Sequence, residues 1–121
     1  MYAAVVAPDN LKEINFVNQH RTTAGTIVQS LFRLKDTENM DGGYFVFPDI
    51  SVRIEGVFRL RFTLYEISGQ RVKDMGTAYS EPFRVYSAKQ FPGMAESTCM
   101  TRAFSDQGVR IRIRKESRLS M

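Results

Sequence analysis

A run of strictly alternating residues constrains the fold of this chain more than any other feature of the sequence. It is "VFRLRFTLYEI", residues 57–67. Its large apolar members are Phe58, Leu60, Phe62 and Leu64. Arg59, Arg61 and Thr63 lie between them. Because successive side chains of a strand point to opposite faces, the run predicts a strand that places its four apolar groups in the core.

Three further stretches favour short strands. "GTIVQSLFRL" (25–34) and "GYFVFPDISVRI" (43–54) are rich in β-branched and aromatic residues, and Pro48 marks a bend or an edge in the second. "AYSEPFRVYS" (78–87) predicts a strand with Phe83 and Val85 on one face and Arg84 and Tyr86 on the other. The Asp, Asn and Gly residues of 39–43 and 68–76 predict hairpin connections.

Strands at this spacing, without alternating helices, predict one all-β domain with an immunoglobulin-like β-sandwich. One helix is expected in "ESTCMTRAFSDQG" (96–108), capped by Ser97 or Thr98 and closed by Gly108. Met100, Ala103 and Phe104 would share its inner face. The alternation in "GVRIRIRKE" (108–116) predicts that a last strand follows this short helix.

Several chemistries are disfavoured by composition. His20 is the only histidine and Cys99 the only cysteine, so the sequence offers neither a usual zinc ligand set nor an intrachain disulfide, and it shows no catalytic triad signature. The glycines form no phosphate-binding loop. We therefore predict no enzymatic activity, no metal and no cofactor. The sequence also contains no apolar run long enough to cross a bilayer and no secretory signal, which predicts a soluble intracellular protein.

Positive charge is concentrated at one end of the chain. Residues 1–108 hold equal numbers of basic and acidic residues, so the formal net charge of +4 comes from the last thirteen. There Arg110, Arg112 and Arg114 alternate with apolar residues. This row is either a surface for nucleic-acid phosphates or the solvated face of a strand, and the pattern leaves both open. The same choice applies to Arg59 and Arg61.

Two long stretches resemble a known family. "DGGYFVFPDISVRIEGVFRLRFTLYEI" (41–67) and "SEPFRVYSAKQFPGMAESTCMTRAFSDQGVRIRIRKE" (80–116) resemble the velvet domain of fungal regulators of development, sporulation and secondary metabolism. "RTTAGTIVQSLFRLKD" (21–36) is similar to the velvet segment that precedes the first of them. The block "YSAKQFPGMAEST" (86–98) is the most diagnostic, because a Lys-x-Phe-Pro-Gly turn before a capped helix is no general feature of β-sandwiches.

The resemblance implies a Rel-homology-like sandwich in a transcriptional regulator that binds DNA. It also implies a nuclear location, shared with the cytoplasm, and a homodimer or a heterodimer with another velvet protein. The family's chief DNA-reading element, a Cys-Gly-Phe-Gly stretch, does not occur in this sequence. We therefore expect residues 1–121 to be a single velvet domain that is incomplete at its N-terminus.

Without that stretch, any DNA contact is expected to go mainly to phosphates, through Arg110, Arg112, Arg114 and Lys115. The alternative is a velvet module that only dimerises and does not read a DNA sequence. A third hypothesis, a β-sandwich that binds a small ligand between its sheets, is disfavoured because exposed aromatic residues do not cluster in the sequence.

Overall fold

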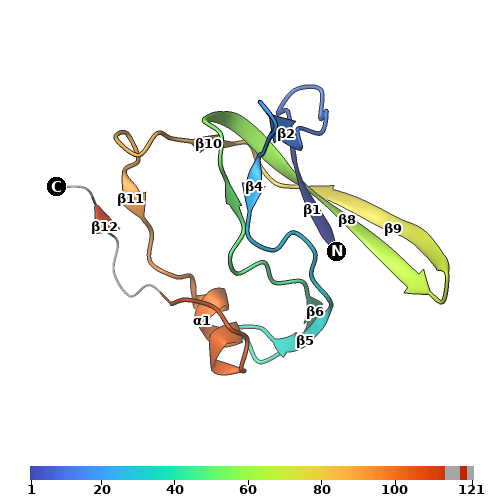
Figure 1. Ribbon diagram of the computed structural model, residues 1–121. Coiled ribbons are helices and arrows are strands. Elements are labelled where there is room, and N and C mark those ends of the chain that lie inside the picture. Colours follow the sequence, from blue (N-terminus) through green and yellow to red (C-terminus); the bar gives the residue numbers. More distant parts are fainter. Residues whose placement is uncertain (114–117, 120–121) are drawn as a thin grey trace.

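The computed structural model describes residues 1–113 and 118–119 and is mostly β-strand, with one short helix near the C-terminal end (Figure 1). Its main sheet has four strands: β1 (Tyr2–Val6), β8 (Gly56–Ser68), β9 (Arg71–Tyr79) and β10 (Phe83–Val85). β8 is the central strand, with β1 on one side and β9 and β10 pairing with its two halves. The distal part of the β8–β9 hairpin extends away from the other elements (Figure 1).

Strand β1 forms the best-buried part of the molecule. Ala3, Ala4, Val5 and Val6 are each at most 2% exposed. The strand pairs with β8 along one edge, from Tyr2 opposite Thr63 to Val6 opposite Arg59. On its other edge the Ala3 N–H donates to the Ile27 carbonyl at 2.8 Å. Neighbours on both edges explain why this short apolar strand is almost inaccessible to solvent.

The strand predicted at 57–67 is confirmed as β8, but its apolar face is buried only in part. Phe58 is 7% exposed, whereas Leu60, Phe62 and Leu64 are half-buried. The ring of Phe47 covers Phe62, with ring centroids 5.5 Å apart. Thr63, on the opposite face, is 5% exposed because Tyr2 and Thr77 flank it on the two neighbouring strands. The prediction of four fully buried apolar groups was therefore too simple.

Four two-stranded pairs complete the described strands. They are β2 (Phe16–Val17) with β3 (His20–Arg21), β4 (Thr23–Ala24) with β7 (Ser51–Val52), β5 (Phe32–Lys35) with β6 (Asp41–Tyr44), and β11 (Gly93–Met94) with β12 (Arg118–Leu119). The described residues thus show a mostly β architecture, and the sandwich topology stays a prediction.

Only the end of the strand-rich stretch 25–34 is a strand, as part of β5, whereas 43–54 is interrupted between β6 and β7 around Pro48, where the sequence predicted a bend or an edge. Gly25 has φ +87°, and a Cβ there would collide with the Asp49 carbonyl oxygen, so the chain must turn at a glycine between β4 and β5. Between β6 and β7 the chain leaves strand geometry in the stretch that contains Pro48, which lacks the N–H that a ladder requires. The strand predicted within 78–87 is confirmed as β10, with Phe83 and Val85 more buried than Arg84.

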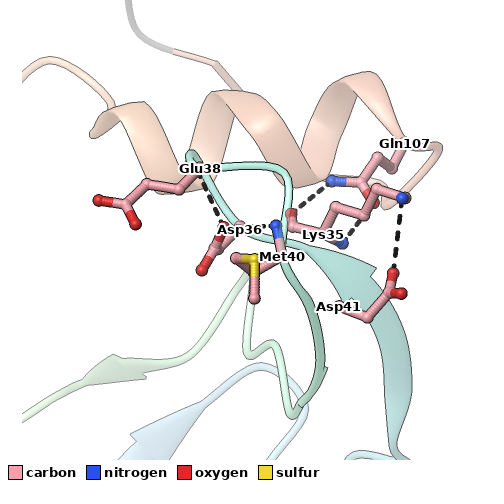
Figure 2. Close-up of polar contacts among 6 residues, drawn as sticks. All are labelled: Lys35, Asp36, Glu38, Met40, Asp41 and Gln107. Carbon is pink, nitrogen blue, oxygen red and sulfur yellow. Dashed lines mark hydrogen bonds and ion pairs between the residues drawn. The ribbon is translucent and has the colours of Figure 1, made fainter.

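One predicted connection is confirmed and the other needs correction. A hairpin connection does join β5 to β6, but it spans residues 36–40, since β6 begins at Asp41, and Asn39 has φ +63° there. The carboxylate of Asp36 accepts the N–H groups of Glu38 and Met40 at 2.8 and 2.9 Å and closes this turn (Figure 2). By contrast, most of 68–76 belongs to β9, and only Gly69 and Gln70 form the turn. Turn-forming residue types misled the prediction because β8 supplies the backbone pairing that residues 71–76 need.

The predicted helix is confirmed as α1 (Cys99–Asp106). The Thr98 hydroxyl accepts the Thr101 N–H at 3.1 Å, and Gly108 follows the helix with φ +101°. Phe104 is buried, whereas Met100 is 37% exposed. The strand predicted over 108–116 was wrong for residues 109–113, which form no strand, and residues 114–117 lie outside the described part of the chain. β12 begins only at Arg118.

Candidate nucleic-acid interface

A side-chain amide attaches the end of α1 to strand β5 (Figure 2). The Lys35 N–H donates to Oε1 of Gln107 at 2.7 Å, and Nε2 of Gln107 donates to the Lys35 carbonyl at 2.7 Å. The same nitrogen donates to the Ala103 carbonyl at 3.0 Å. Gln107 therefore pairs with β5 much as a neighbouring strand would, and this fixes where the chain leaves the helix.

An apolar cluster beneath the helix anchors the segment that follows. Its buried members are Leu34, Phe104 and Val109, and Tyr44, Val46 and Ile111 pack against them. The rings of Tyr44 and Phe104 lie 4.6 Å apart. The Val109 N–H also donates to the Phe104 carbonyl at 3.2 Å. We call β5, β6, α1 and residues 107–113 the α1–β5 unit, because this cluster holds them together.

Packing in the α1–β5 unit determines which side chains of the basic segment face solvent. Val109 is 8% exposed and Ile111 is half-buried, whereas Arg110 and Arg112 are exposed. The predicted in-and-out alternation is therefore present, although no strand produces it. Within the described residues neither arginine has an ion-pair partner. Arg114 and Lys115, the other two predicted contacts, lie outside the described residues.

The same unit carries two cations that the sequence reasoning did not select. Arg33 and Lys35 flank the buried Leu34 on β5, and both are exposed. Lys35 lies 3.6 Å from a carboxylate oxygen of Asp41, but the two side chains are 52% and 87% exposed, so water screens the pair strongly (Figure 2). The signal for these residues was the alternation in "LFRLK", which becomes informative only once Leu34 is known to be buried.

Arg59 and Arg61, in contrast, are held within the main sheet. Nη2 of Arg61 lies 3.1 Å from a Glu13 carboxylate oxygen, with the two side chains 24% and 32% exposed. The Tyr2 hydroxyl donates to the same carboxylate at 3.1 Å. Burial, and next the hydrogen bond to Glu13, raise the pKa of Tyr2 above its usual value of 10.0. Arg61 therefore balances a partly buried carboxylate, which makes it a poor candidate for a phosphate contact.

The described residues offer little for catalysis or metal binding. They contain no group of three or more His, Cys, Asp and Glu side chains able to hold a metal ion. His20 is exposed on β3, and Cys99 is an exposed free thiol. None of the described helices has the length and apolar character to span a bilayer. The chemistry that the α1–β5 unit does offer is electrostatic attraction of anions by exposed guanidinium and ammonium groups.

The comparisons with known proteins all indicate the same family. The model of the family described as Velvet factor matches residues 7–118. The spore development regulator vosA of Penicillium rubens is 60% identical over 95 residues, covering 78% of this chain and 24% of that protein. The spore development regulator umv1 of Mycosarcoma maydis is 43% identical over 120 residues, covering 98% of this chain and 15% of that protein.

A third relative carries a different name. The velvet complex subunit 2 of Gibberella moniliformis is 44% identical over 109 residues, which cover 82% of this chain and 24% of that protein. The chain thus spans about a quarter or less of the length of these relatives. Because the family model matches nearly the whole sequence, the chain belongs to the velvet family, whose members are regulators of transcription and not enzymes.

Proposed function

We propose that this chain is a transcriptional regulator of fungal development, sporulation and secondary metabolism. In this proposal residues 1–121 form one velvet domain that works in a nuclear dimeric complex and contacts DNA. The names of the relatives, spore development regulator and velvet complex subunit, support the regulatory role. The DNA contact is supported by two exposed arginines, Arg110 and Arg112. They lie on the packed α1–β5 unit, in the segment that holds the excess positive charge of the sequence.

The contacts are assigned to Arg110, Arg112, Arg114 and Lys115. Each cation that neutralises a phosphate releases condensed counterions, so binding through this segment depends on salt and hardly on base sequence. Because residues 109–113 are not tied into a sheet, their arginines are free to adjust to the backbone of a duplex. The anchoring by Val109 and Ile111 keeps the segment on the surface of the α1–β5 unit.

Partnership with another velvet protein is supported by the exposed surface of the chain. Large apolar side chains are exposed on the β8–β9 hairpin, where Ile67 is 75% and Val72 64% exposed. Apolar surface of this kind is typical of interaction sites.

Fluorescence anisotropy with a labelled duplex tests the DNA contact. We expect the variant with Arg110, Arg112 and Arg114 changed to Gln to bind at least about tenfold more weakly at low salt. A matched control changes Arg53, Arg71 and Lys73, three exposed cations outside the α1–β5 unit, to Gln. Equal losses in the two variants would mean that only net charge matters and would contradict the assignment.

The second candidate function is a velvet module that only dimerises. It is favoured by the same exposed apolar side chains, which a protein partner would cover and which give DNA no role. Sedimentation of the chain alone and with a velvet relative tests association. Association together with no measurable duplex binding would select this function, and a monomer at micromolar concentration in both experiments would exclude it.

A further inference from the structure

One face of the β5–β6 hairpin carries two cations at alternate positions of β5. Arg33 and Lys35 are exposed and flank Leu34, which packs into the apolar cluster beneath α1. Successive side chains of a strand point to opposite faces, so the two cations extend from the face that Leu34 does not occupy. Two residues span about 6.6 Å along a strand, which lets each cation meet a different phosphate.

The strand opposite leaves Arg33 without a counter-charge. Arg33 lies opposite Gly43 on β6. Lys35 lies opposite Asp41. Both backbone groups of Lys35 bond to Gln107, so these two pairs are of the non-hydrogen-bonded kind, in which opposite side chains come closest. Lys35 therefore lies 3.6 Å from a carboxylate oxygen of Asp41 (Figure 2), whereas Arg33 faces a residue with no side chain. Among the described residues Arg33 has no ion-pair partner.

An open hollow of about 680 Å³ lies beside the two cations. Gly42 and Gly43 contribute to its lining, and because neither has a side chain, a ligand can approach the backbone of β6 closely. The charged residues of the lining are Arg33, Lys35 and Asp41, which leave it with a net positive charge. The hollow therefore suits an anionic group that reaches the Arg33 guanidinium.

We propose that Arg33 and Lys35 form a second phosphate-contact site for nucleic acid, in addition to the basic segment that begins at Arg110. This inference rests on the proposed DNA contact and extends it to β5. Arg33 is the main contact, because its guanidinium has no counter-charge and can bind a phosphate through two N–H groups. Lys35 contributes less, since Asp41 competes for its ammonium group.

Position favours nucleic acid over an acidic protein segment as the occupant. Leu34, between the two cations, shares its apolar cluster with Val109 and Ile111, which flank Arg110. The hollow and the basic segment thus belong to one packed unit. A duplex presents phosphates all along a helical turn of about 34 Å, so a single duplex is long enough to meet both sets of cations. An acidic protein segment would need separate carboxylates at each place.

The dependence of duplex affinity on salt tests Arg33. In fluorescence anisotropy, Arg33→Gln should weaken binding about fivefold at low salt and make the slope of log affinity against log salt shallower by about 0.9. Arg33→Lys keeps the charge and should keep the slope. The matched control is Arg53→Gln, at an exposed arginine that also has no ion-pair partner among the described residues. Equal changes in Arg33→Gln and Arg53→Gln would mean that only net charge matters and would overturn the proposal.

Asp41→Asn tests the contribution of Lys35. The substitution removes the carboxylate that competes for the ammonium group, so duplex affinity should rise by about twofold or more at low salt. The control is Glu38→Gln, at an exposed carboxylate in the connection between β5 and β6 that does not line the hollow, and it should raise affinity less. Equal gains from the two substitutions would contradict the role of Lys35.

The outcomes separate this inference from the proposed function on which it rests. If changing Arg110, Arg112 and Arg114 to Gln makes the slope shallower but Arg33→Gln keeps the native slope, the basic segment binds DNA and this inference is wrong. If the native chain binds no duplex at low salt, the proposed DNA contact fails, and this inference fails with it. A glutamate-rich peptide whose binding needs Arg33, when duplex binding does not, would make acidic protein the occupant and would also overturn the proposal.

Discussion

Replacing Phe104 tests whether the cluster beneath α1 holds the basic segment in place. Phe104 is 6% exposed, contacts the Tyr44 ring at 4.6 Å and packs with Leu34 and Val109. Phe104→Ala leaves a cavity that typically costs about 3–5 kcal/mol, and loss of the aromatic pair lies within that range. Alanine has a better helix propensity than phenylalanine, which offsets about 0.5 kcal/mol of this loss of stability. We expect the free energy of unfolding to fall by about 3–4 kcal/mol.

Urea denaturation followed by circular dichroism measures this loss. Met100→Ala is the matched control on the same helix, because Met100 is 37% exposed, and it should cost less than about 1 kcal/mol. In Phe104→Ala, proteolysis after Arg110 and Arg112 should also accelerate, since Val109 loses its anchor. A destabilisation below about 1 kcal/mol, or equal effects of the two substitutions, would refute the claim that Phe104 organises the α1–β5 unit.

Three further predictions concern stability. Gln107→Ala should destabilise the chain by about 1 kcal/mol in urea denaturation, because it removes the two hydrogen bonds of the amide to β5. The loss is small because water replaces part of these bonds. An unchanged midpoint would show that the pairing does not contribute to stability. Phe58→Ala should lower the free energy of unfolding by about 3–5 kcal/mol and Phe62→Ala by clearly less, since Phe58 is buried and Phe62 only half-buried. A larger loss for Phe62→Ala would mean that the other end of β8 lies in the core. Folding raises the pKa of Tyr2, so the contribution of Tyr2 to stability is complete below pH 10 and is lost as the pH rises through the folded-state pKa. Tyr2→Phe should therefore flatten the alkaline decline of the melting temperature. An identical decline in the variant and the native chain would contradict this prediction.

The elements that the sequence predicted well are those whose local signals agree with their surroundings. β8 alternates strictly, and α1 has a capping threonine before it and a glycine after it, so period and caps define both without tertiary information. β1 was missed because its residues 3–6 are all apolar and small or β-branched, with no alternation to detect. β9 was missed because its Gly, Asp and Lys residues are typical of turns, and only pairing with β8 makes them a strand.

The candidate site was likewise predicted only in part. The inward and outward sides of 109–113 were predicted, since apolar and basic residues alternate there. The strand predicted there does not form at 109–113, because Val109 packs into the helix cluster and no described strand pairs with the segment. The roles of Gln107 and Arg61 depend on partners 72 and 48 positions away in sequence, which one sequence does not reveal.

The slope of duplex affinity against salt is the most direct test of the assignment of DNA contact to the basic segment. We expect log affinity to fall linearly with log salt for the native chain, and the slope to become shallower by up to about three units when Arg110, Arg112 and Arg114 are changed to Gln, because each phosphate contact contributes about 0.9. The control variant at Arg53, Arg71 and Lys73 should keep the native slope. An unchanged slope in the first variant would mean that these arginines face solvent, and would contradict the account.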